Sequence, residues 1–221
     1  MSDGPPSAQL APPPPEAARE LFGERLPLAV RYADLLADAG VVRGLIGPRE
    51  VPRLWERHLL NCAVIAPELD AGDRVADVGS GAGLPGLVIA IVRPDVSVTL
   101  IEPMLRRTTF LTETVELLGL GNVTVRRDRA EDARDLAGGF DVVTARAVAP
   151  LEKLAGWTVP LLRPGGRLLA LKGSTAAEEL AEAGTSLAGL GISEAVVRTF
   201  GPLTDPTTVI EARGVALARF T

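Results

Sequence analysis

The chain has 221 residues, of which 47% are apolar and only 4% aromatic. Because a typical domain has about 150 residues, this length predicts one domain, with or without an appendage. The apolar content excludes a chain that stays unfolded throughout. Asp and Glu outnumber Lys and Arg by 28 to 23, so the net charge of −5 does not by itself indicate a nucleic-acid binder. The single cysteine, Cys62, excludes an internal disulfide framework, and we expect no metal site.

The chain carries no sign of a membrane or secretory segment. Its longest apolar run, Leu87–Val92, is far shorter than the roughly 20 residues that span a bilayer. The N-terminus lacks the cationic stretch and apolar core of a secretory signal. We therefore expect a soluble, cytoplasmic protein with no membrane partner.

The N-terminal third predicts a tail followed by helices. Residues 1–15 are rich in proline and poor in charge, which predicts a disordered or polyproline tail. Apolar residues at helical spacing predict one helix over residues 16–39 and a second from about 49 to 66. We interpret residues 16–70 as a helical extension of the main domain, residues 71–221.

After Asp73, β-branched runs alternate with helical segments, which predicts a mostly parallel sheet covered on both faces. The final two runs, at residues 194–201 and 207–215, follow each other without a helix and predict an antiparallel hairpin. The predicted fold is therefore α/β, with a sheet that the hairpin completes to seven strands. The five strands before the hairpin are expected within the runs RVADVG, VSVTLIEP, NVTVRRD, FDVVTAR and GRLLALKG.

A glycine-rich segment, residues 76–86, follows the first of these strands and opens a helix. Glycines there let the backbone turn sharply and approach a ligand at the carboxyl edge of the sheet. Gly81, Gly83 and Gly86 form the pattern G-x-G-x-x-G. Alone, this pattern is weak evidence for any one ligand, because it fits a dinucleotide site, an S-adenosylmethionine site or a simple tight turn.

Two carboxylates favour S-adenosylmethionine over NAD as the ligand. Asp77 precedes the loop, where it would repel a pyrophosphate but attract a cationic sulfonium and ammonium group. Glu102, at the end of the second strand, is placed to accept hydrogen bonds from both ribose hydroxyls. A nicotinamide oxidoreductase and a non-enzymatic nucleotide-binding module remain alternatives.

Four phrases in chain order resemble the RsmG (GidB) family of bacterial methyltransferases: RHLL from Arg57, DVGSGAGLPG from Asp77, TARAVA from Thr144, and LKG from Leu171. The similarity covers roughly residues 20–213. It implies a class I methyltransferase (Rossmann-like) fold, S-adenosyl-L-methionine as cofactor, and methylation of guanine N7 in 16S ribosomal RNA. It also implies a cofactor site formed by Gly79, Leu84, Ala130, Glu131 and Arg146, in which Ala130 and Glu131 hold the adenine end.

Arg146, at the end of the fourth strand, is the predicted catalytic residue. A guanidinium pairs naturally with guanine O6 or with phosphate; the alternative is an ion pair with Glu131 or Asp141. The chain lacks the Asn/Asp-Pro-Pro-aromatic phrase that holds exocyclic amines, and Cys62 lies among apolar residues that indicate a core position. Guanine N7 needs neither group, because its lone pair lies in the ring plane. A small-molecule or protein acceptor remains the alternative substrate.

The predicted partner is 16S ribosomal RNA or the small ribosomal subunit. Arg49, Arg53 and Arg57 recur every four residues, which predicts one helical stripe facing the RNA. His58 is interpreted either as a structural residue or as an RNA contact. Lys172, at the end of the fifth strand, either binds a phosphate or caps the strand edge. Trp55 and Trp157 are expected in the core.

Overall fold

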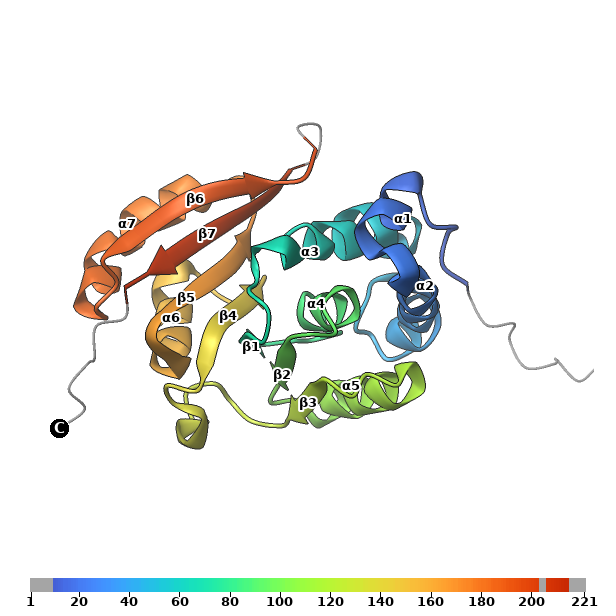
Figure 1. Ribbon diagram of the computed structural model, residues 1–221, viewed down its shortest axis with the longest axis horizontal. Helices are drawn as coiled ribbons and strands as arrows, with labels where there is room; N and C mark the ends of the chain where they lie inside the picture. The colour runs from blue at the N-terminus through green and yellow to red at the C-terminus, as the bar shows by residue number, and fades with distance from the viewer. Residues whose placement is uncertain (1–9, 203–205, 215–221) are drawn as a thin grey trace, which may run out of the picture.

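The computed structural model describes residues 10–202 and 206–214, and its centre is one sheet of seven strands (Figure 1). The strand order is β3-β2-β1-β4-β5-β7-β6. Strands β1 to β5 are parallel, β7 is antiparallel to β5, and β6 is antiparallel to β7, which confirms the predicted mostly parallel sheet and its hairpin. The strands are β1 (Arg74–Val78), β2 (Ser97–Ile101), β3 (Val123–Arg126), β4 (Phe140–Arg146), β5 (Leu162–Lys172), β6 (Glu194–Phe200) and β7 (Thr207–Arg213).

Helices cover both faces of the sheet. Because alternate residues of a strand point to opposite faces, Val75 packs into the core that contains α4 and α5, and Ala76 into the core that contains α6 and α7. Among the residues described, no helix is both long and apolar enough to cross a membrane. The helices on the sheet are α4 (Gly86–Val92), α5 (Leu105–Leu118), α6 (Leu151–Thr158) and α7 (Ala176–Gly189).

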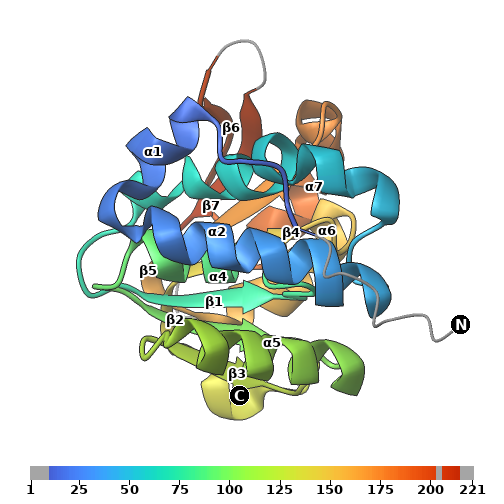
Figure 2. The same ribbon diagram turned by 90° about the vertical axis from the view of Figure 1, so that its right-hand side faces the viewer.

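The N-terminal helical region lies over α4 and α5 and shares their core (Figure 2). It contains α1 (Glu16–Phe22), α2 (Leu26–Leu35) and α3 (Asn61–Ala63). The prediction of two continuous helices is wrong in detail, because short 3-10 and π-helical segments interrupt both of them. Gly23, at a φ of 49°, ends α1, and Pro52, which cannot donate a backbone hydrogen bond, lies in a 3-10 segment, Pro48–Arg53, before the π-helical segment Leu54–Leu60.

Part of the predicted disordered tail is held against this region. The amide of Ala11 donates to Asp34 Oδ1 at 3.0 Å, and Trp55 Nε1 donates to the carbonyl oxygen of Pro12 at 2.7 Å. The prediction of disorder is therefore wrong for residues 10–15. The rest of that predicted tail, residues 1–9, lies outside the described residues, as do residues 203–205, between β6 and β7, and residues 215–221.

Candidate active site

The loop between β1 and α4, Gly79–Pro85 (here the glycine loop), requires glycine for two separate reasons. Gly79 and Gly81 have φ values of 68° and 58°, in the left-handed region that glycine adopts without strain. A Cβ on Gly79 would also lie only 2.8 Å from Val148 Cγ2. The loop therefore brings a bare backbone against the segment that follows β4.

Asp77 lies behind the glycine loop and does not line the cavities described below. Its Oδ2 accepts a hydrogen bond of 3.0 Å from the amide of Gly86, and the Thr144 hydroxyl donates to Oδ1 at 3.4 Å. Burial raises the pKa of Asp77 to about 6, and these hydrogen bonds oppose the rise. The carboxylate therefore holds the first residue of α4, Gly86, through this hydrogen bond.

Glu102 follows β2 and faces the glycine loop. Its Oε2 accepts a hydrogen bond from the amide of Gly81 and its Oε1 one from the amide of Met104, both at 3.0 Å. Arg107 Nη1 lies 3.4 Å from the same Oε2, and the side chain of Glu102 is buried. A buried carboxylate with this many donors is held in one orientation at the loop.

A first cavity, of about 610 Å³, opens at the carboxyl ends of β1 and β2. It brings together four predicted residues from three segments of the chain: Gly79, Glu102, and the adjacent Ala130 and Glu131. Gly81, Gly83 and Leu84, also predicted, lie in the glycine loop but are not on the cavity wall, and neither is Arg146, which lines the second cavity described below. The other lining residues include Val78, Ile101, Pro103, Met104, Arg107, Asp128, Arg129, Lys153 and Trp157.

A second cavity, of about 670 Å³, lies beside the first and shares Ala147 and Val148 with it. Ala147 has a φ of 53°, a strained value for a residue with a side chain, and such residues cluster at functional sites. Cationic side chains line this second cavity: Arg57, Arg146 and Lys172. Ala147 and Val148, which follow β4, thus form a wall that the two cavities share.

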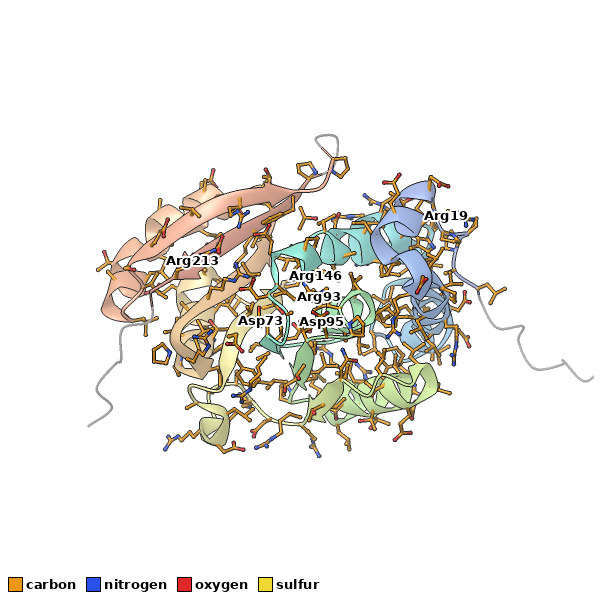
Figure 3. All side chains as sticks on the ribbon, viewed as in Figure 1. Arg19, Asp73, Arg93, Asp95, Arg146 and Arg213 are labelled. Atoms are coloured by element: carbon orange, nitrogen blue, oxygen red, sulfur yellow. The ribbon has the colours of Figure 1, made fainter. Side chains whose placement is uncertain are left out.

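Arg146, labelled in Figure 3, lines the second cavity and is hydrogen-bonded to the N-terminal helical region. Its Nη1 donates to the carbonyl oxygen of Arg57 at 3.3 Å, and its Nη2 donates to His58 Nδ1 at 3.1 Å. The alternative ion pair is not formed: Asp141 pairs with Arg163, and Glu131 with Arg129. Within the described chain, no carboxylate is within ion-pair distance of Arg146.

His58 is neutral in this arrangement. A guanidinium only donates hydrogen bonds, so His58 Nδ1 must accept and its proton must lie on Nε2, 3.0 Å from Glu50 Oε2. Burial, then the charge of Arg146, lowers the pKa of His58. The hydrogen bond from His58 in turn lowers the pKa of Glu50.

The other predicted RNA contacts have mixed outcomes. Arg49, Arg53 and Arg57 are exposed, but they lie in the 3-10 and π-helical segments, so the α-helical spacing behind the predicted stripe is wrong. Lys172 lines the second cavity and also caps the strand edge, since its Nζ lies 2.6 Å from Glu179 Oε2 and 2.8 Å from the Ala149 carbonyl oxygen.

The sequence did not indicate Tyr32 as a site residue, and it placed Trp157 in the core. The hydroxyl of buried Tyr32 donates to the carbonyl oxygen of Ala82 in the glycine loop at 2.8 Å, a contact that no local pattern signals. Trp157, expected in the core with Trp55, is half-buried and lines the first cavity, with Lys153 Nζ 5.0 Å from its ring.

Two other predicted core residues are confirmed. Trp55 is buried, and so is Cys62, whose thiol has its pKa raised to about 11 by burial. No cluster of three or more possible metal-ligating side chains occurs in the part of the chain that the structure describes.

The chain is similar to known proteins over most of its length. The GidB family model, described as rRNA small subunit methyltransferase G, matches residues 25–204. Ribosomal RNA small subunit methyltransferase G of Streptomyces avermitilis is 62% identical over 200 residues, covering 90% of this chain and 84% of that protein. The protein of the same name from Thermobifida fusca is 63% identical, covering 89% and 83%.

Solved structures share the fold at much lower identity. TYW2 of M. jannaschii, solved in complex with AdoMet, has a TM-score of 0.56 at 18% identity, covering 72% of this chain and 76% of that one. A SAM-dependent O-methyltransferase of Thermotoga maritima has a TM-score of 0.53 at 19% identity, covering 71% and 65%. The fold is therefore that of class I S-adenosylmethionine-dependent methyltransferases. By its family match and its relatives, the chain belongs to the GidB family, rRNA small subunit methyltransferase G.

Proposed function

We propose that this chain transfers a methyl group from S-adenosylmethionine to N7 of a guanine in 16S ribosomal RNA. The observation that carries this proposal is the pair of cavities on either side of Ala147 and Val148. The first is lined by Gly79 and by charged side chains of both signs, Glu102 among them. The second is lined by Arg57, Arg146 and Lys172, together with Glu179 and Glu182. A donor and an acceptor held in these two spaces would meet at the shared wall.

The first cavity fits an adenosyl cofactor. Its volume of about 610 Å³ lies within the roughly 300–1,000 Å³ of small-molecule sites. The carboxylate of Glu102 accepts two amide hydrogen bonds and, with about four acceptor positions, retains capacity for ribose hydroxyls. Gly79 lines the cavity through its backbone, and Ala130 and Glu131 are candidates for the adenine end. Bound there, S-adenosylmethionine supplies the methyl group as a sulfonium.

Arg146 is our candidate for holding the acceptor. A guanidinium carries five N–H donors, of which two are used in bonds to Arg57 and His58. The remaining donors are available to guanine O6 at the edge that also carries N7. Because N7 attacks with its own lone pair, the protein needs to align it and does not need to remove a proton. Alignment of two reactants contributes about 7–11 kcal/mol to lowering a barrier.

The proposed RNA surface surrounds the second cavity. Arg57 lines that cavity, and Arg49 and Arg53 are exposed on the preceding segment. Guanidinium groups there would pair with backbone phosphates and orient the RNA without reading its sequence. We propose the small ribosomal subunit or its 16S RNA as partner, which places the protein in the cytoplasm.

A small-molecule or protein acceptor is the second candidate, and the net charge of −5 favours it. Mass mapping of 16S ribosomal RNA from cells with and without this protein distinguishes the two. The proposal predicts one N7-methylguanine that disappears without the protein and returns with the wild-type chain. An unchanged methylation map would favour the second candidate. Calorimetric titration provides a separate test of the cofactor, with binding of S-adenosylhomocysteine expected and binding of NADH not.

A further inference from the structure

We propose that Glu50 and His58 form a hydrogen-bonded relay that positions the Arg146 guanidinium at the second cavity and works only while His58 is neutral. The inference rests on the proposed function, in which Arg146 holds the acceptor. Glu50 Oε2 lies 3.0 Å from His58 Nε2, and His58 Nδ1 lies 3.1 Å from Arg146 Nη2. Glu50 and His58 are thus positioning residues, since each acts on the acceptor through Arg146.

The relay has a defined direction of hydrogen bonding. Arg146 has donors only and Glu50, when ionised, has acceptors only. A neutral imidazole with its proton on Nε2 satisfies both neighbours at once. A protonated imidazole would place an N–H against a guanidinium N–H, which breaks the hydrogen bond and brings two positive charges together. Protonation of His58 therefore frees Arg146 from one of its two anchors, the other being the carbonyl oxygen of Arg57.

The charges around His58 set the pH range of this switch. Three charged groups act on the imidazole. Glu50 lies in the 3-10 segment, Arg57 lies in the π-helical segment that also contains His58, and Arg146 lies at the end of β4. Burial and Arg146 hold the pKa of His58 below 6.5, while the hydrogen bond to Glu50 opposes this shift. The relay is consequently intact at neutral pH and is lost as the pH falls through the pKa of His58.

The relay also gives the N-terminal helical region a role in methyl transfer, which is to hold the Arg146 guanidinium in place. Arg146 ends a sheet strand, yet its guanidinium is held by residues 88 and 89 positions earlier in the chain. Hydrogen bonds to a charged group are among the stronger ones in proteins. Removal of the hydrogen bond to His58 is expected to release a catalytic side chain without disturbing the first cavity.

Nuclear magnetic resonance of the imidazole tests the relay directly. The chain has a single histidine, so tag-free protein gives one imidazole to follow. We expect the Nε2–H tautomer at neutral pH and a titration midpoint below 6.5. Arg146→Gln should raise the midpoint and Glu50→Gln should lower it, whereas the control Glu56→Gln, an exposed carboxylate of the same region, should leave it unchanged. An Nδ1–H tautomer, or a midpoint that neither Arg146→Gln nor Glu50→Gln moves, would overturn the relay.

Kinetics then test whether the relay serves the reaction. With small ribosomal subunits as substrate, His58→Leu should lower kcat by roughly tenfold to a hundredfold, with unchanged affinity for S-adenosylhomocysteine. His58→Asn keeps an acceptor near the Nδ1 position and does not titrate, so it should recover part of kcat and lose the acidic limb of the pH profile. Wild-type kcat in His58→Leu, or an unchanged acidic limb in His58→Asn, would contradict the relay. If the wild-type chain methylates no RNA, the proposed function fails, while the resonance experiment still decides whether the relay exists.

Discussion

The hydroxyl of Tyr32 in α2 donates a hydrogen bond of 2.8 Å to the carbonyl oxygen of Ala82 in the glycine loop. The two residues are 50 positions apart in the chain. Burial raises the pKa of Tyr32 well above its usual value, so the phenol stays protonated and keeps its donor. The N-terminal helical region therefore supports the glycine loop directly.

Tyr32→Phe should weaken both the fold and the cofactor site. The substitution leaves the buried carbonyl of Ala82 without this donor, which costs about 1–3 kcal/mol. Urea unfolding measures the decrease in stability, and calorimetric titration with S-adenosylhomocysteine should show weaker binding. Thr158→Val is the matched control, because it removes a buried hydroxyl that donates to Leu154 in α6 and does not line either cavity. Equal effects of both variants on cofactor binding would argue against the role of Tyr32.

Gly79→Ala should abolish cofactor binding, and Gly72→Ala should not. Both glycines have positive φ, 68° and 83°, so alanine strains the backbone at either position by roughly 1–2 kcal/mol. Only at Gly79 would the new Cβ meet Val148, since nothing lies within 4 Å of the corresponding position at Gly72. Titration with S-adenosylhomocysteine compares the two variants at matched stability. Similar binding by both would show that close approach at Gly79 is unimportant.

Asp77→Asn should change how stability depends on pH. Burial raises the pKa of Asp77 from 3.8 to about 6, so the folded state binds this proton more tightly than the unfolded state. The stability from this protonation is fully present below the unfolded pKa and is lost as the pH rises through the folded pKa. Relative to wild type, Asp77→Asn should therefore gain up to about 3 kcal/mol between about pH 4 and pH 7. Urea unfolding across that range measures the difference, and parallel curves for the two proteins would contradict the shift.

Replacement of Arg49, Arg53 and Arg57 together by Glu should abolish RNA methylation and leave cofactor affinity intact. Like charges would then face the phosphates, and the salt dependence of RNA binding should fall by about one unit of slope for each phosphate that is no longer bound. The single variants Arg57→Glu and Arg19→Glu form a matched pair, because both arginines are exposed but Arg57 lines the second cavity and Arg19, in α1, lines neither cavity. Unchanged methylation in the triple variant would remove these arginines from the RNA surface.

The sheet could be predicted because its signals are local. Four of the five parallel strands lie within their predicted runs, and the fifth, β5, begins at Leu162, four residues before its run GRLLALKG. The hairpin was indicated by two runs with no helix between them. Glu102 and Gly79 could be placed near each other because the carboxyl ends of parallel strands meet at one edge of the sheet, and both line the first cavity there.

The helical extension and the acceptor side could not be predicted in the same way. Apolar spacing indicates helices but does not distinguish α from 3-10 and π geometry, so the segment from Pro48 to Leu60 was assigned an α-helical spacing that it does not have. The bonds from Tyr32 to Ala82 and from Arg146 to His58 join residues far apart in the chain. Such contacts depend on tertiary packing, and no local sequence pattern predicts them.

The most direct test of the account is to find which atom receives the methyl group. Purified chain would be incubated with isotopically labelled S-adenosylmethionine and small ribosomal subunits from cells that lack it, and the RNA digested for mass spectrometry. We expect the label in a single N7-methylguanine of the 16S RNA, and its strong reduction with Arg146→Gln. Label on another atom, or no label transferred to RNA by a chain that binds the cofactor, would contradict the account.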